Sequence, residues 1–374
     1  MQTIKGINVF GSSVDNGALE QMIRCSKDAV LCALMADHHK GYALPIGGVI
    51  AYDGKISPSG VGYDIGCGNK AIRVGATKWD IQDRLPQIMD AIEKAISFGV
   101  GQKNHNIIHH PLFSDYAWKM GAVAPLLQMA REQFGTVGSG NHYVDIFADE
   151  TDDVWIGVHF GSRGLGHKIA THFLKAGGAK DGMDVDPLLL DVGTPLGIDY
   201  LEAMRLAGAY ASAGRDWVCD QVAAIIGAPI TDSVHNHHNY AWKEGGLWVI
   251  RKGATPLVDG QRCFVGGSMG DKSYILQGVS SLDLDAAMHS TVHGAGRVMS
   301  RSQAKRTISQ EEMNGRLEAI GVILRGGGLD EAPQAYKSIE DVVQSQGDSV
   351  RVVHTLRPLG VCMAGAGEFD PYKD

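Results

Sequence analysis

The spacing of apolar residues predicts two long helices. Between residues 80 and 97 these residues recur three and four positions apart, which is the period of one face of an α-helix; they are Ile81, Leu85, Ile88, Met89, Ile92 and Ile96. A second run, from residue 199 to about residue 226, carries Leu201, Met204, Tyr210, Trp217, Val222 and Ile225. It is followed by Gly-Ala-Pro, a sequence typical of a helix end.

Shorter apolar runs at residues 155–160, 247–250 and 350–353 predict strands. The predicted helices and strands alternate without a regular strand–helix–strand rhythm, which favours an α+β fold over a doubly wound parallel sheet. No internal repeat or low-complexity linker divides the chain, so we expect one large mixed domain over residues 1–374. Residues 177–197, rich in Gly, Asp and Pro, are expected to form a long loop or insertion, and residues 366–374 an extra C-terminal tail.

Charge and composition narrow the class of protein. A formal net charge of -8 argues against strong non-specific attraction to nucleic acid, so any RNA contact needs a local basic patch. The two candidate patches are Arg297, Arg301, Lys305 and Arg306, and the pair Arg251 and Lys252. The absence of a signal-peptide pattern and of a run of about 18 apolar residues predicts a cytoplasmic protein without a membrane span. The six scattered cysteines do not resemble a disulfide framework.

Four segments combine glycine or asparagine with residues that bind metals. In the first, Asp64 and Cys67 lie three positions apart, so a carboxylate and a thiolate can share one metal environment, although such a pair alone is more often part of a turn. The other three present His142 in G-S-G-N-H, His159 in V-H-F-G-S-R-G and His238 in V-H-N-H-H-N. Thiolate, imidazole and carboxylate together suit zinc, manganese, iron or cobalt.

A fifth segment, residues 289–297, places His293 directly before a small-residue turn that we expect to open a helix. Free backbone amides and the helix dipole at such an end favour phosphate. A neutral imidazole there can attack phosphorus and hold the product as a phosphoramidate. The alternative for this segment alone is that His293 is an ordinary residue at a helix start.

Taken together, these segments resemble the RtcB-type RNA ligases, in the family's order and over residues 37–365. The resemblance implies the family's α+β fold, with a loop-built metal site in a central cleft. It implies an enzyme that joins RNA 3′-phosphate or 2′,3′-cyclic phosphate ends to 5′-hydroxyl ends, in tRNA splicing or RNA repair. Two manganese ions and GTP as co-substrate are implied with it, and an activating protein partner is compatible with it.

Individual roles follow from the matched motifs. Asp64 and Cys67 are implied metal ligands, with Cys67 bridging two ions. His142 would join Asp64 at one ion, and His159 and His238 would bind the other. His293, in H-G-A-G-R, is implied to carry guanylate. The implied nucleotide-binding residues are Asn141, Asp145, Asn239, Gly267, Ser268, Met269, Ser273, His293, Gly294, Ala295, Gly296 and Tyr336, and Arg163, Arg297 and Arg301 are implied phosphate clamps.

The chain departs from the family pattern at three places. Phe160 stands where a serine is common, and Gly266 stands where the guanine-pocket turn usually has proline. The family chain usually ends in a Lys-Gly pair whose lysine reaches the guanylate, whereas residues 361–365 here read V-C-M-A-G and a tail follows. Lys373 in that tail is a candidate substitute, and we expect weaker nucleotide binding than in typical relatives.

Two other functions compete with ligation. A metal-dependent cyclic phosphodiesterase or phosphatase would need the same metal ligands but neither His293 nor a guanine pocket. A non-catalytic RNA-end binding protein would be consistent with the missing terminal lysine. An intact set of thiol and histidine ligands argues against this second alternative, because such groups are costly to bury without a metal.

Overall fold

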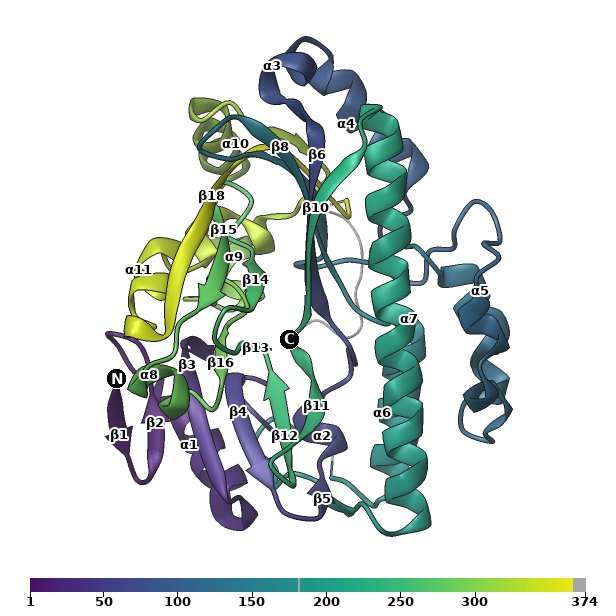
Figure 1. Cartoon of the computed structure of the whole chain (residues 1–374), viewed down its shortest axis with the longest axis vertical. Helices are drawn as coiled ribbons and strands as arrows, with labels where there is room; N and C mark the ends of the chain where they lie inside the picture. The colour runs from purple at the N-terminus through teal and green to yellow at the C-terminus, as the bar shows by residue number, and fades with distance from the viewer. Residues whose placement is uncertain (181, 366–374) are drawn as a thin grey trace.

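The computed structural model describes residues 1–180 and 182–365, and its strands form two main sheets (Figure 1). The smaller sheet has the order β1–β2–β3–β4–β12–β11 and is antiparallel except where β2 pairs with β3. Its strands are β1 (Gln2–Ile4), β2 (Ile7–Val9), β3 (Leu31–His39), β4 (Ile46–Tyr52), β12 (Leu247–Lys252) and β11 (Asn239–Glu244).

The larger sheet has the order β10–β6–β8–β7–β18–β15–β14, with β17 paired in parallel to β18. Its strands are β10 (Ile230–His237), β6 (Gly68–Thr77), β8 (Asp153–Phe160), β7 (Tyr143–Ala148), β18 (Val350–Met363), β15 (Ser273–Gly278), β14 (Arg262–Val265) and β17 (Ile323–Arg325). Two short pairs join β13 (Ala254–Pro256) to β16 (Ser290–Val292) and β5 (Lys55–Ile56) to β9 (Leu190–Asp191). The largely antiparallel pairing confirms a mixed α/β chain rather than a doubly wound one.

Helix α7 (Pro195–Ile226) is the longest element and runs beside β10 and β6 (Figure 1). Thr194 caps its start by accepting a hydrogen bond from the N–H of Gly197, and Gly227 ends it in the left-handed region at φ +78°. The other helices are α1 (Asn16–Cys25), α2 (Pro58–Val61), α3 (Lys78–Ile81), α4 (Leu85–Ala95), α5 (Leu127–Gln133), α6 (Arg163–Ala176), α8 (Leu282–Ala286), α9 (Arg301–Thr307), α10 (Gln310–Ala319) and α11 (Ile339–Gln344).

One buried cluster joins the large sheet to α7 and α4. It is formed by side chains that include Ile72, Ile156 and Val158 from the strands, Val218 and Val222 from α7, and Ile88 and Ile92 from α4. Each of these seven side chains is at most 3% exposed. Their burial holds the sheet against the helices, so the ends of the strands lie at defined positions beside α7.

The predicted helices and strands are confirmed with shifted bounds. The run at 199–226 is α7, which starts at Pro195. The run at 80–97 is divided into α3 and α4, because Pro86 has no N–H to continue the helical hydrogen bonds. The three predicted strands belong to β8, β12 and β18.

Two further expectations concern the loop at 177–197 and the tail. The loop is present over residues 177–180 and 182–189, but β9 and the start of α7 occupy its second half. The tail at 366–374, with Lys373, lies outside the described residues.

All six cysteines are free, and five of them are buried. Within the part of the chain that the structure describes, no helix is both long and apolar enough to cross a membrane.

Candidate metal centre and nucleotide cavity

The register of the large sheet brings distant metal-binding residues to one edge. Neighbouring strands are antiparallel, so the start of one lies beside the end of the next. Gly68, which follows Cys67, pairs with both Phe160 and His237, and Tyr143, which follows His142, pairs with His159. The beginnings of β6 and β7 and the ends of β8 and β10 therefore meet at a single edge.

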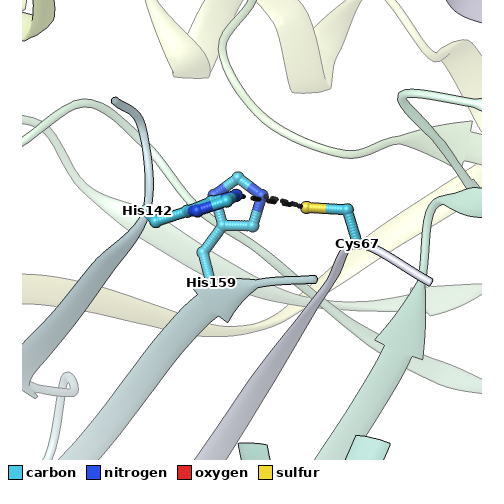
Figure 2. A group of neighbouring side chains, drawn as sticks. All are labelled: Cys67, His142 and His159. Carbon is cyan, nitrogen blue, oxygen red and sulfur yellow. Dashed lines mark hydrogen bonds between the residues drawn. The ribbon is translucent and has the colours of Figure 1, made fainter. Parts of the chain in front are cut away.

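Cys67, His142 and His159 converge there, as Figure 2 shows. The Cys67 Sγ lies 3.3 Å from the His159 Nε2 and 3.7 Å from the His142 Nε2. One potential ligand atom from each of the three residues lies within 4.8 Å of the others. A buried sulfur and two imidazole nitrogens at these distances can hold a metal ion.

Asp64 and His238 extend this group. The Asp64 Oδ2 lies 3.2 Å from the His142 Nε2, and the His238 Nε2 lies 3.3 Å from the His159 Nε2. The neighbouring histidines of the crowded segment lie elsewhere: His235 and His237 contact the guanidinium of Arg215. We call Asp64, Cys67, His142, His159 and His238 the cluster end of the site.

The protonation states of the two buried histidines at the cluster end leave ring nitrogens available to bind a metal cation. The His159 Nδ1 lies 3.0 Å from the carbonyl of Asn141, which can only accept, so Nδ1 carries the proton and Nε2 keeps its lone pair. Burial lowers the pKa of His159 and of His238 well below the usual value, so both rings are neutral. Burial, together with the Asp64 carboxylate, raises the pKa of the Cys67 thiol well above its usual value. A metal would therefore have to displace the thiol proton on binding.

Asp64 behaves as an ionised carboxylate. Burial acts to raise its pKa, but the hydrogen bond and charge of His142 and the charge of Arg163 together lower the pKa to about 2. The donor set thus contains an anionic oxygen, a thiol and three imidazoles, which fits a borderline divalent ion such as manganese or zinc.

His293 is oriented by a buried carboxylate that sequence reasoning did not include in the site. The His293 Nδ1 lies 2.6 Å from the Oδ2 of Asp37, and the backbone N–H groups of His293 and Gly294 donate to the same oxygen. Asp37 lies in β3 and is fully buried. Burial acts to raise its pKa, but the charge and hydrogen bonds of His293 lower it, so Asp37 is a carboxylate. The hydrogen bond to Asp37 fixes the tautomer of the ring: in neutral His293 the proton is on Nδ1 and the lone pair is on Nε2.

The prediction of a helix directly after His293 is wrong. Residues 293–300 contain no helix, and α9 begins at Arg301 with Ser300 as its cap. The chain instead runs across β3, where Gly296 has φ +74° and a Cβ on it would lie 2.3 Å from the carbonyl oxygen of Asp37. Tertiary contact with Asp37 thus overrides the helical pattern, and no helix dipole acts at His293.

A cavity of about 660 Å³ opens at the cluster end. All five cluster-end residues and His293 line it. So do most of the residues implied to bind nucleotide, namely Asn141, Asp145, Asn239, Gly267, Ser268, Met269, Gly294, Ala295, Gly296 and Tyr336. Ser273 is not part of the lining; its Oγ instead accepts a hydrogen bond from the N–H of Gly267, 3.0 Å away.

One wall of the cavity combines buried polar groups with apolar side chains. This β7–β18 wall consists of Tyr143 and Asp145 from β7 and Val361 and Met363 from β18. The Tyr143 hydroxyl and the Asp145 Oδ1 are buried and have no hydrogen-bond partner among the described residues. Burial raises the pKa of Asp145 well above its usual value. The wall therefore offers polar atoms to a ligand, whereas residues 361–365 add only apolar groups to the lining.

The predicted phosphate clamps have protein partners. The Arg163 Nη1 donates to the His142 Nδ1 at 3.2 Å, and Arg163 is not part of the cavity lining. Arg297 and Arg301 line the cavity and pair with the buried Glu331, and Arg301 also approaches Asp330. Arg297 and Arg301 thus already have carboxylate partners within the protein.

The prediction of a second basic patch, formed by Arg251 and Lys252, is wrong. Arg251 is fully buried and pairs with Glu244, 2.7 Å away. Lys252 is buried and donates to the carbonyl of Tyr42. Neither side chain forms a surface for RNA, because strand β12 directs both into the interior.

Comparison with known proteins places the chain in a family. Residues 21–364 match the family described as tRNA-splicing ligase RtcB, so the chain belongs to the RtcB family. RNA-splicing ligase RtcB of Escherichia coli K12 is 33% identical, over 95% of this chain and 96% of the relative. RNA-splicing ligase RtcB of Mycobacterium tuberculosis is 32% identical, over 88% and 96%. tRNA-splicing ligase RtcB of Thermococcus kodakarensis is 30% identical, over 88% and 86%.

Proposed function

We propose that the chain is a manganese- and GTP-dependent RNA ligase that joins RNA 3′-phosphate or 2′,3′-cyclic phosphate ends to 5′-hydroxyl ends through guanylate on His293. Membership of the RtcB family and the names of the relatives support RNA ligation. The observation that carries the mechanism is the pair of Asp37 and His293, in which the buried Asp37 orients the histidine and His293 lines the same cavity as a buried thiol and histidine group.

The cluster end would hold two ions. Asp64, Cys67 and His142 would bind one, and Cys67, His159 and His238 the other. Bound manganese would offset negative charge on the reacting phosphates. The protein prepares this site with the Asn141 carbonyl, which orients His159, and with burial, which keeps the His159 and His238 rings neutral.

His293 would act as the nucleophile of the first step. Its Nε2 lone pair attacks the α-phosphorus of GTP, an N–P bond forms, and the bond to the β-phosphate oxygen breaks to release pyrophosphate. Asp37 holds the proton on Nδ1 throughout and stabilises the positive charge that the ring acquires. The product is guanylate attached to His293.

The RNA would then take the guanylate. An oxygen of the RNA 3′-phosphate attacks the phosphorus on His293, and the N–P bond breaks to restore the imidazole. The 5′-hydroxyl of the second RNA attacks the activated 3′-phosphorus, and GMP leaves. A 2′,3′-cyclic phosphate would first be opened by water to a 3′-phosphate.

The β7–β18 wall would receive the guanine base. Guanine carries N–H donors on one edge, and Asp145 offers a buried carboxyl oxygen without a partner. The segment from Gly267 to Met269 and the ring of Tyr336 would complete the base pocket, with Ser273 holding the Gly267 amide. The Asn239 Oδ1 accepts from the N–H of Gly253 at 2.8 Å, so Asn239 would also fix the turn beside His238.

The test is covalent labelling. The protein is incubated with manganese and GTP labelled at the α-phosphate, and we expect an adduct that is labile to acid and stable to base. His293→Ala should retain manganese, because this residue is not a proposed ligand, yet take up no label and join no RNA ends. Label on a histidine of the variant would show that the nucleophile lies elsewhere. A wild-type protein that opens cyclic phosphates without ever being labelled would be the phosphodiesterase of the competing hypothesis.

A further inference from the structure

Arg215 is a fully buried arginine on the face of α7 that meets the large sheet. Its Nη1 donates to the carbonyl oxygen of Gly66 at 2.9 Å and also to the carbonyl oxygen of Phe160. Its Nε donates to the His235 Nε2 at 2.8 Å, and its Nη2 lies 2.9 Å from the His237 Nδ1. One guanidinium thus has partners on three separate segments of the chain.

Three of these partners are direct sequence neighbours of proposed metal ligands. Gly66 precedes Cys67, Phe160 follows His159, and His237 precedes His238. These segments form the start of β6 and the ends of β8 and β10, which lie side by side in the sheet. Arg215 therefore links the three strand ends from the side of α7, without itself lining the cavity.

Backbone packing at the same place is close. A Cβ on Gly66 would lie 2.9 Å from the Cα of Gly208 on α7. The N–H of His238 donates to the carbonyl oxygen of Cys67 at 2.8 Å. Helix α7 thus supports the loop that carries Cys67 directly as well as through Arg215.

A buried positive charge such as that of Arg215 is unusual in a residue whose only role is to fill space in the core. None of its hydrogen bonds reaches a carboxylate in the described part of the chain. Burying a guanidinium on carbonyls and imidazoles costs free energy that an apolar side chain would not. Burial lowers its pKa only to about 10, so it stays protonated at neutral pH. Its planar fork of five N–H donors reaches two carbonyl oxygens and the His235 Nε2 at once and also faces the His237 Nδ1, which the single ammonium of lysine cannot do.

We propose that Arg215 is a positioning residue for the metal-ligand set. By tying Gly66, Phe160 and His237 to one rigid group, it keeps Cys67, His159 and His238 facing a common point. The inference rests on the proposed function, because it concerns the cation that the cluster end would hold.

The experiment measures metal binding directly. Wild-type protein and Arg215→Lys are titrated with Mn²⁺ by calorimetry, and both are loaded with Co²⁺ to record the absorption band of the cobalt–thiolate bond. We expect Arg215→Lys to bind Mn²⁺ about tenfold to hundredfold more weakly, as is typical when a group behind a metal ligand is removed. Its cobalt–thiolate band should shift or weaken even at saturating Co²⁺.

Arg251→Lys is the matched control. Arg251 is buried to the same extent and hydrogen-bonded to Glu244, Ser290 and two backbone carbonyls, but it touches no neighbour of a proposed ligand. We expect a lower Tm in Arg251→Lys with unchanged Mn²⁺ affinity and cobalt spectrum. If Arg215→Lys behaves in the same way, with a lower Tm and wild-type metal binding, Arg215 is only structural and the proposal is overturned.

A second variant covers the case in which Arg215→Lys does not fold. His237→Phe keeps the ring, which stacks on Tyr240 with centroids 5.4 Å apart, but removes the Nδ1, which lies 2.9 Å from both the Arg215 Nη2 and the carbonyl oxygen of Gly66. The variant therefore tests the group formed by Arg215, His237 and Gly66. Mn²⁺ binding about tenfold weaker supports the proposal, and unchanged binding contradicts it. Failure of wild-type protein to bind Mn²⁺ or Co²⁺ would instead contradict the proposed function, so the two failures are distinguishable.

Discussion

At the cluster end of the cavity and at His293 beside it, the protein orients its own histidines, whereas along the β7–β18 wall it leaves buried oxygens without partners. The Asn141 carbonyl orients His159, Arg163 contacts His142, and Asp37 orients His293. The Tyr143 hydroxyl and the Asp145 Oδ1 have no such partner in the described chain. In the first region the His238 Nδ1 and the Asp37 Oδ1 also lack a partner, but His159, His142 and His293 are held before any ligand arrives. The polar atoms of the second region acquire hydrogen bonds only from a ligand. We therefore expect nearly complete losses from changes in the first region and graded losses in the second.

The largest effect is expected at Cys67. Cys67→Ser should lose bound manganese and reduce ligation below detection, because a hydroxyl is a far poorer ligand than a thiolate. Metal content after gel filtration and RNA joining would both be measured. Cys263→Ser is the control, since Cys263 is also buried but belongs to an apolar cluster that contains none of the proposed ligands. Full metal content in Cys67→Ser would remove Cys67 from the ligand set.

A smaller effect is expected at Asp37, whose carboxylate orients His293 without being a proposed ligand. Asp37→Asn keeps the shape of the side chain but no longer holds the proton on Nδ1 or stabilises positive charge on the ring. Guanylylation should fall about 10²-fold to 10⁴-fold. Manganese affinity should not change, which separates this variant from Cys67→Ser. A rate of labelling equal to that of wild type would show that Asp37 has no role in the first step.

A graded effect is expected on the β7–β18 wall. Asp145→Asn keeps one acceptor oxygen but replaces the other with an amide group that can only donate, so one N–H group of guanine loses its acceptor. Because a buried donor left without a partner costs about 1 to 3 kcal/mol, the GTP concentration for half-maximal labelling should rise about fivefold to hundredfold. The maximal rate and manganese binding should change little. If the variant labels normally at low GTP, the base lies elsewhere in the cavity.

The smallest effect is expected at the C-terminus. Residues 361–365 contribute only the apolar Val361 and Met363 to the lining, and none of them is the lysine that the family resemblance implies at this place. The GTP requirement of the whole chain should therefore exceed that of typical relatives by about tenfold to hundredfold. Truncation after Gly365 tests whether Lys373 compensates. A truncated protein with wild-type GTP dependence would exclude the tail from the pocket.

The local sequence pattern was sufficient to predict several helices and strands and the motifs of the proposed ligands. Apolar periodicity was sufficient for α7 and for the strands at 155–160, 247–250 and 350–353, because helix and strand periods are properties of neighbouring residues. Motif order was sufficient to bring Asp64, Cys67, His142, His159 and His238 under consideration together. Their assignment as ligands still depends on the metal experiments.

Only the tertiary structure decided which residues are hydrogen-bond partners in the site. Asp37 and His293 are separated by 256 positions, so no local pattern could pair them. The segment after His293 has a helix-like start but lies across β3, because Gly296 packs on the carbonyl oxygen of Asp37. Arg215 and Arg251 look like surface charges in the sequence, yet α7 and β12 bury both. A side chain's burial and its hydrogen-bond partners depend on which strands become neighbours, and that is settled only when the whole sheet has formed.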